Sequence, residues 1–283
     1  MYRVIHLCLF YCLFSVLIAC KPLPPSVLSS DALSTSVPGA SVTSTQLPAI
    51  TAEAATLAAD TAVTQPVPTK AATLSPTRTQ TFGAISDMVC SPLQHETIAS
   101  LAEIVSDPYK PPPPGRDERH QGVDFSYYHH GGRNTIEGEG IRSIMTGTVA
   151  TVVLDRLPYG NMVIIETPAS ILPKEFLSAF QVSEEESLYH LYAHMQTFPL
   201  VQVGEVVECG QPLGTVGMTG YNIVNPHLHL ETRIGPAGVK FTGMAFYTTD
   251  ASIEEMENYQ RWRTSGEFRH FDPMSIFAWF LEQ

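Results

Sequence analysis

Asn225-Pro226-His227-Leu228-His229-Leu230-Glu231 places two histidines two residues apart in a stretch with the character of a β-strand. Side chains at positions i and i+2 of a strand point to the same face, so both imidazoles are expected to face one cleft. Leu228 and Leu230 then point to the opposite side, where we expect a hydrophobic core. A lone histidine on an apolar strand is usually a core residue whose hydrogen bonds are satisfied. Two histidines on the same face are less often explained in this way, and the commonest cause of such clustering is a bound metal ion.

Two motifs upstream carry the same kinds of side chain. His120-Gln121-Gly122-Val123-Asp124 places a histidine and an aspartate four residues apart, and Leu191-Tyr192-Ala193-His194 ends another strand-like run. Imidazole nitrogen and carboxylate oxygen both bind Zn²⁺ well. The sequence has no H-E-x-x-H helix, so the thermolysin pattern is excluded. His190 would share a strand face with His194 and is a further candidate to line the cleft.

In the order H-x-x-x-D, a lone histidine and H-x-H, these motifs resemble the lysostaphin-type zinc metallopeptidases, the LytM-like peptidoglycan endopeptidases. The resemblance covers roughly residues 105 to 235 and implies that His120, Asp124 and His229 are zinc ligands. It also implies that His194 and His227 assist catalysis. Three protein ligands leave a fourth position for water, as a catalytic zinc site requires. Geometry alone does not assign the two roles within H-x-H, since either ring could reach the cleft.

Residues 1–20 predict an export signal. Arg3 is the only formally charged side chain there, and the apolar run from Ile5 to Ala19 is too short and too early for a spanning helix. Leu17-Ile18-Ala19-Cys20 resembles a bacterial lipobox, which implies cleavage before Cys20 and lipid attachment to it. We therefore expect an exported protein, anchored through lipidated Cys20 at the outward face of a bacterial membrane. An ordinary signal peptide that happens to contain a cysteine is the alternative.

Residues 21–85 predict a disordered tether. Ser, Thr, Ala and Pro dominate this segment, and it has no aromatic residue before Phe82. Such a composition buries too little apolar surface to offset the entropy lost on ordering. Composition does not decide whether the tether is a glycosylated stalk.

Residues 86–283 have the length of one domain, which we expect to be the zinc metallopeptidase domain. Strand candidates dominate it, because runs rich in β-branched residues recur between Gly, Pro or Asn. These candidates are residues 141–145, 148–154, 161–166, 188–194, 205–209 and 227–233. Short helices are expected within residues 92–106 and 272–280, and the acidic insert 168–186 could hold a helical turn that walls the cleft.

This density of strands predicts a mainly β, antiparallel domain. The resemblance sharpens the expectation to a twisted sheet or half-open barrel of the lysostaphin-like type, a duplicated hybrid motif. We expect short helices at its periphery and one zinc ion in a groove on one face.

The net charge of the chain limits the classes of partner it can bind, and its cysteines indicate a possible disulfide. The chain has 16 basic and 28 acidic residues, a net charge of −12, which argues against nucleic acid as a partner. Cys8 and Cys12 would leave with the signal, and Cys20 would carry the lipid. Cys90 and Cys209 remain, and an exported protein can join them in a disulfide.

Two functions from different classes remain open, and under either one we expect the protein to be a monomer. The first is a zinc-dependent endopeptidase that hydrolyses the peptide stems or cross-links of peptidoglycan. The second is a catalytically silent module of the same fold that binds the wall or activates another hydrolase. All five motif positions are present, which favours the enzyme. A zinc-binding solute receptor is disfavoured, because receptors usually close the coordination of the metal. The sequence leaves open whether glycyl bridges or D-Ala-linked cross-links are cut.

Overall fold

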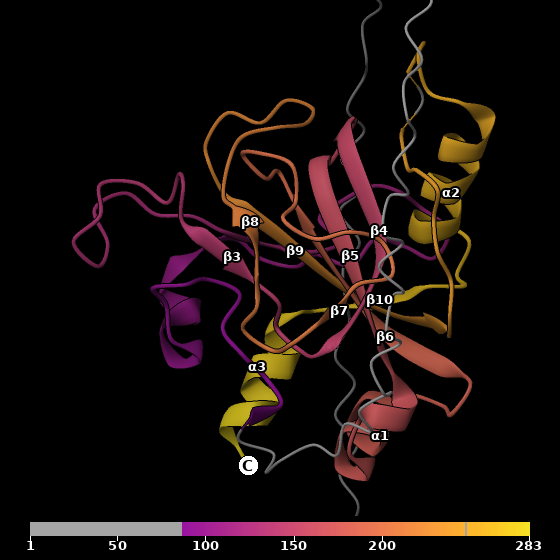
Figure 1. Ribbon diagram of the computed structural model, residues 1–283, viewed down its shortest axis with the longest axis horizontal. Helices are drawn as coiled ribbons and strands as arrows, with labels where there is room; N and C mark the ends of the chain where they lie inside the picture. The colour runs from indigo at the N-terminus through magenta and orange to yellow at the C-terminus, as the bar shows by residue number, and fades with distance from the viewer. Residues whose placement is uncertain (1–86, 247) are drawn as a thin grey trace, which may run out of the picture. The chain divides into compact units, whose positions relative to one another are not determined.

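The structure, a computed structural model, describes residues 87–246 and 248–283 (Figure 1). The expected signal (1–20) and tether (21–85) lie outside the described residues, so both stay predictions. Among the described residues, no helix is both long enough and apolar enough to span a membrane.

An eight-stranded antiparallel sheet forms the centre of the domain (Figure 1). Seven strands follow the order β1-β2-β9-β6-β5-β4-β7, and β10 pairs with β9. The sheet is open, because its path begins at β1 and ends at β7. The bounds are β1 Val105–Asp107, β2 Val123–Phe125, β4 Gly147–Arg156, β5 Gly160–Pro168, β6 Glu186–Ala193, β7 Val206–Val207, β9 Leu228–Pro236 and β10 Arg269–Phe271. A separate two-stranded sheet joins β3 (Gly140–Arg142) to β8 (Pro212–Thr215). The predicted mainly β, antiparallel fold is confirmed.

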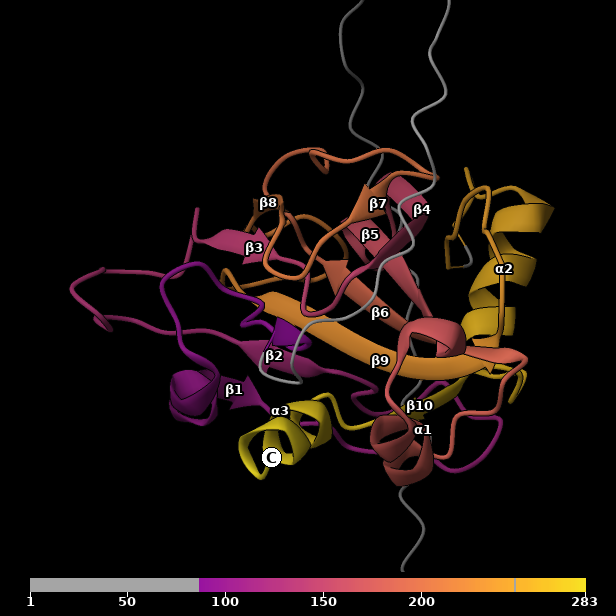
Figure 2. The same ribbon diagram turned by 60° about the horizontal axis from the view of Figure 1, so that its bottom comes forward.

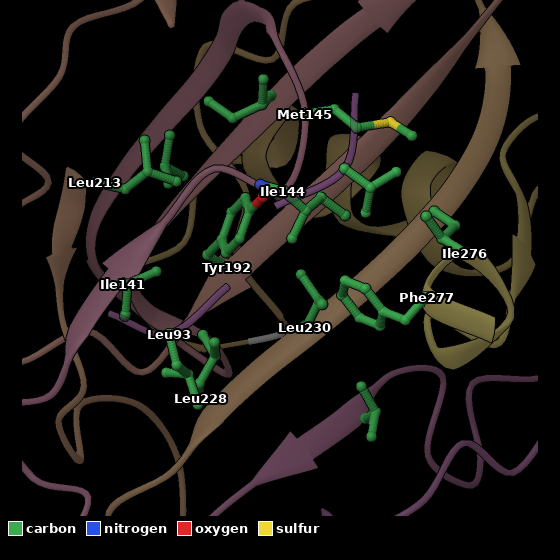
Figure 3. Close-up of a cluster of buried hydrophobic side chains, with 14 of the residues drawn as sticks. Leu93, Ile141, Ile144, Met145, Tyr192, Leu213, Leu228, Leu230, Ile276 and Phe277 are labelled. Atoms are coloured by element: carbon green, nitrogen blue, oxygen red, sulfur yellow. Dashed lines mark hydrogen bonds between the residues drawn. The ribbon is translucent and has the colours of Figure 1, made fainter. Parts of the chain in front are cut away.

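Both faces of the large sheet are covered, which explains why its central strands β5, β6 and β9 are buried at nearly every position. In β5, Val163 and Ile165 point into the main core, whereas Met162 and Ile164 point into a second core on the other face. Leu228 and Leu230 lie in the main core, as expected (Figure 3). The same picture shows Tyr192 pointing into this core, where its hydroxyl accepts a hydrogen bond from the Ile144 backbone N–H (2.8 Å).

Short helices cover the main-core face. They are the 3-10 helices η2 (Ile98–Ile104) and η3 (Ala169–Ile171), and the α-helices α1 (Lys174–Phe180) and α3 (Met274–Leu281). The helices expected within residues 92–106 and 272–280 are therefore confirmed as η2 and α3. Figure 2 shows α1 and α3 beneath β9.

The expectation that the 168–186 insert walls the cleft is wrong. Phe176 of α1 is fully buried in the main core and meets the Trp279 ring of α3 edge-on, with centroids 5.2 Å apart. Aromatic packing thus draws the insert to the face opposite the histidines.

A helix that the sequence reading did not predict closes the second core. Helix α2 (Ile253–Arg263) begins at Ser252, whose hydroxyl accepts from the Glu255 N–H while the Glu255 carboxylate accepts from the Ser252 N–H. This reciprocal cap satisfies two backbone donors at the helix start. Trp262 and Tyr259 then bury their rings in the second core.

Cys90 and Cys209 form a disulfide, with Cα atoms 5.6 Å apart across 119 residues of sequence. The bridge predicted from the cysteine count is confirmed. It fastens the first described segment of the domain to the stretch just after β7.

Candidate metal centre

Strand pairing brings the three sequence motifs together. Asp124 on β2 stands directly opposite His229 on β9, and Ala193 at the end of β6 stands opposite His229 on the other side. Strand β9 is therefore the middle of the site, between the strand that carries the aspartate and the strand that leads to His194. The site lies on the face opposite the main core, as expected.

Three donor atoms converge there. His120 Nε2 lies 3.0 Å from Asp124 Oδ1 and 3.0 Å from His229 Nδ1, and His229 Nδ1 lies 2.8 Å from Asp124 Oδ1. Within the described residues these three form the one group of this kind able to hold a metal ion, with one donor each. Two imidazoles and a carboxylate are the ligand types that Zn²⁺ takes in catalytic sites, so this donor set fits that ion.

The outer nitrogens of both imidazoles are held by oxygen acceptors. His120 Nδ1 donates to the Pro108 carbonyl (3.1 Å), and His229 Nε2 donates to the Glu231 carboxylate (3.1 Å). The inner nitrogens, His120 Nε2 and His229 Nδ1, face the Asp124 carboxylate, which also only accepts. With a metal ion bound, each outer nitrogen would keep its proton and each inner nitrogen would offer its lone pair to the ion. Metal-binding histidines usually have such outer partners.

His194 and His227 lie beside this group with similar tautomers. His194 Nδ1 donates to the Thr219 carbonyl (2.8 Å), and His227 Nδ1 donates to the Asn225 carbonyl (2.9 Å). Their ring centroids are 4.7 Å apart, and His227 Nε2 lies 3.6 Å from Asp124 Oδ2. Each neutral ring therefore has an unprotonated Nε2. The structure thus brings all five predicted residues into one site.

His190 does not join them, which corrects the expectation that it lines the cleft. It is fully buried and bonds Thr167 Oγ1 (3.0 Å) and the Tyr192 hydroxyl (2.9 Å). Strand β6 ends at Ala193, and His194 has a φ of 60°. A positive φ is rare for a residue with a side chain and ends the alternation of the strand, so the two histidines separate.

The electrostatics of the site favour a cation. Burial raises the pKa of Asp124, but hydrogen bonds from His120 and His229 outweigh it and hold that pKa well below its usual range. Burial lowers the pKa of His229, yet its hydrogen bonds to Asp124 and Glu231 raise it to about 9. Two carboxylates thus stabilise positive charge at this ring, and a divalent ion can supply that charge as well as a proton does.

The pKa of His194 is shifted in the opposite direction from that of His229. Burial, helped by His229 and His227, lowers the pKa of His194 to about 3. The ring is therefore uncharged near neutral pH.

Gly122 permits the close approach of β2 to β9. A Cβ atom at this position would lie 2.5 Å from the Leu230 carbonyl oxygen and 2.8 Å from His229 Cε1. Real Cβ atoms do not make such contacts, so only a glycine lets the backbone pass this close to His229 and Leu230.

A cavity of about 580 Å³ opens over these side chains. Its rim includes the exposed side chains of Tyr128, Tyr221 and Val224, and the Tyr128 hydroxyl donates to Asn225 Oδ1 (2.9 Å). The cavity is therefore a groove with aromatic and apolar walls over a floor of histidines and Asp124.

Sequence reasoning missed Glu231, which contacts His229 from behind. Its side chain is fully buried, with the carboxylate bonded to Tyr159, Trp262, Arg233 and Arg263 as well. Positions 229, 231 and 233 share a strand face by the same two-residue period that pairs His227 with His229. That period could have marked Glu231, but its remaining partners come from distant parts of the chain.

The protein is thus an open antiparallel β domain in which two histidines and an aspartate converge in a groove. Residues 118–241 match the model of peptidase family M23. Helix α2 and everything after it lie outside the matched residues.

Solved structures of several peptidases are similar. The catalytic domain of the antimicrobial peptidase lysostaphin from Staphylococcus simulans is 19% identical, with 64% of this chain and 98% of that chain covered and a TM-score of 0.37. The catalytic domain of a mutant of the prophage-encoded M23 protein EnpA from Enterococcus faecalis is 21% identical, with 55% and 90% covered and a TM-score of 0.33. A zinc-containing peptidase from Vibrio cholerae is 22% identical, with 52% and 35% covered and a TM-score of 0.30.

Proposed function

We propose that this protein is a zinc-dependent endopeptidase that hydrolyses the peptide stems or cross-links of bacterial peptidoglycan at the cell envelope. The observation that carries the proposal is the convergence of His120 Nε2, Asp124 Oδ1 and His229 Nδ1 beneath a groove that also holds His194 and His227. The match of residues 118–241 to the model of a peptidase family supports the reaction type.

His120, Asp124 and His229 would hold the ion. Bound Zn²⁺ supplies a Lewis acid and lowers the pKa of a bound water toward about 7. His194 and His227 handle protons, because each neutral ring has a free Nε2 that can accept one. A ring that has gained a proton can then donate to the developing oxyanion or to the leaving amine. The low pKa of His194 makes its imidazolium a strong proton donor once formed.

Peptidoglycan fits both the expected location of the protein and the shape of the groove. The expected lipid anchor at Cys20 and the tether would hold the domain at an outward membrane surface, where this polymer is the peptide-bearing wall. The groove is open and has aromatic walls, which suits an extended peptide. Acidic net charge supports the expectation that nucleic acid is not a partner.

A silent wall-binding module of the same fold is the alternative. The experiment that separates the two is digestion of purified peptidoglycan by the zinc-loaded protein, followed by mass analysis of the released muropeptides. We expect products with new amino termini, none after chelation, and recovery when zinc is restored. Stoichiometric zinc without any released product would overturn the endopeptidase and favour the silent module. The masses of the products would also identify the bond that is cut.

A further inference from the structure

The carboxylate of Glu231 joins His229 to helix α2. Glu231 Oε1 accepts from His229 Nε2 (3.1 Å), from the Tyr159 hydroxyl (2.7 Å) and from Arg263 Nη1 (2.9 Å). Glu231 Oε2 accepts from Trp262 Nε1 (2.9 Å) and from both Nε (3.0 Å) and Nη2 (2.7 Å) of Arg233. Both oxygens are fully engaged, so the carboxylate has a single position and can hold the His229 ring in one orientation.

Two of these donors are the last two residues of α2. Trp262 is fully buried, and Arg263 is nearly so. Arg263 also bonds Asp117 Oδ1 through Nε (2.5 Å), and the Arg233 guanidinium lies over the Trp262 ring, 4.7 Å from its centroid. The end of α2 is therefore locked to the same charged cluster that contacts the candidate ligand.

The charges of this cluster balance. Glu231 and Asp117 supply two carboxylates, and Arg233 and Arg263 supply two guanidinium groups. Removing one partner from a buried ion pair is costly, because the other charge is left without compensation. Without Arg263, Glu231 would have to move toward its remaining donors, and His229 would lose its fixed partner.

We infer that α2, through Trp262 and Arg263, positions the Glu231 carboxylate and thereby orients His229 with Nδ1 toward the metal. Helix α2 is thus part of the metal centre, although it lies outside the residues that match the family model. Outer-sphere partners of metal-binding histidines typically change metal affinity by about 10- to 100-fold when removed. The inference rests on the metal site of the proposed function, and not on the reaction or the substrate.

The test compares three variants of the whole chain. Trp262→Phe keeps an aromatic ring at this position but removes the indole N–H that donates to Glu231. Arg263→Gln removes one charge and the bond to Glu231 Oε1. Arg261→Gln is the matched control, because Arg261 lies on the same helix but pairs with Glu267, away from Glu231. Each protein is titrated with zinc against a competing chelator. Thermal unfolding of the metal-free forms measures any general loss of stability.

We expect zinc dissociation constants about 10-fold higher for Trp262→Phe and about 10- to 100-fold higher for Arg263→Gln, with Arg261→Gln unchanged. With Co²⁺ in place of zinc, the visible absorption should shift in the first two variants only, because it reports the arrangement of the ligands. Unchanged affinity and absorption in both variants would overturn the inference. Equal weakening in the Arg261→Gln control would overturn it as well, since that outcome reports only destabilisation of α2.

The result is separable from the proposed reaction. A wild-type protein that binds zinc, shows the expected variant pattern and releases no muropeptides would contradict the peptidase and support the inference. A wild-type protein that binds no zinc would overturn both.

Discussion

His227 and His229 share a face of the H-x-H stretch, yet their surroundings differ. His229 is buried between two carboxylates, with Nδ1 toward His120 and Asp124. His227 is more exposed, precedes β9, and is held by a loop carbonyl at Asn225. In the proposed function, His229 would hold the ion as part of the donor cluster, whereas His227, beside the cluster, would move protons without binding the ion.

His229→Ala should therefore lose both zinc and activity. His227→Ala and His194→Ala should retain near-stoichiometric zinc and lose about 10²- to 10⁴-fold in turnover. Metal analysis of dialysed variants, beside a wall-digestion assay, checks this. Zinc lost from His227→Ala and kept in His229→Ala would reverse the two roles.

His190 should make the free energy of unfolding fall in acid. Burial lowers its pKa from 6.5 to about 3. Between these values the unfolded chain binds a proton that the folded chain excludes, so stability is present above pH 6.5 and is lost as pH falls. The slope approaches about 1.4 kcal/mol per pH unit and levels off below about pH 3.

We expect His190→Gln to reduce this slope between pH 6 and pH 4, roughly the middle of the titration range. Urea unfolding of the metal-free protein at several pH values measures it. The exposed His129 gives the control, as His129→Asn, which should leave the slope unchanged. Identical slopes for His190→Gln and the wild type would show that His190 is not the group responsible.

At the scale of elements, α1 and α2 lie on opposite sides of the sheet. A substitution in α1 should therefore lower stability without changing the metal site. Phe176 of α1 is fully buried among main-core residues, remote from the groove. Phe176→Ala should lower the free energy of unfolding by about 3–5 kcal/mol, because it leaves a cavity. At a temperature where the variant is folded, zinc affinity and KM should be unchanged. Denaturant unfolding and a zinc titration check this, and a large change in zinc affinity would contradict the separation of α1 from the site.

At the scale of the whole molecule, the Cys90–Cys209 bridge closes a loop of 119 residues. A cross-link of this span restricts the unfolded chain, so its loss should cost about 2–5 kcal/mol. The double variant Cys90→Ser/Cys209→Ser, compared with the wild type by urea unfolding, measures this cost. A thiol titration of the denatured, unreduced domain should find neither cysteine free, and two free thiols would rule the bridge out.

The anchor is also a property of the whole chain. Cys20→Ser should leave the protein without lipid and release it from membranes, because we expect the short apolar run before Cys20 to be a signal and not a spanning helix. Fractionation after a salt wash is the measurement. Retention of the variant in the membrane fraction would contradict the lipobox assignment.

The sequence by itself determined the residue types of the candidate metal site, the strand character of the central segments and the cysteine pair. These are local properties: a period of two residues places His227 and His229 on one face and Leu228 and Leu230 on the other without knowledge of any partner strand. The mainly β class followed for the same reason.

Tertiary structure alone decided what those segments meet. Asp124 faces His229 only because β2 pairs with β9 in one register, and His190 parts from His194 because the backbone turns where β6 ends. An amphipathic helix such as α1 does not encode the face it will cover, and Glu231 gains its role from α2, some thirty residues later. Contacts between distant segments depend on packing and on register, which no local spacing contains.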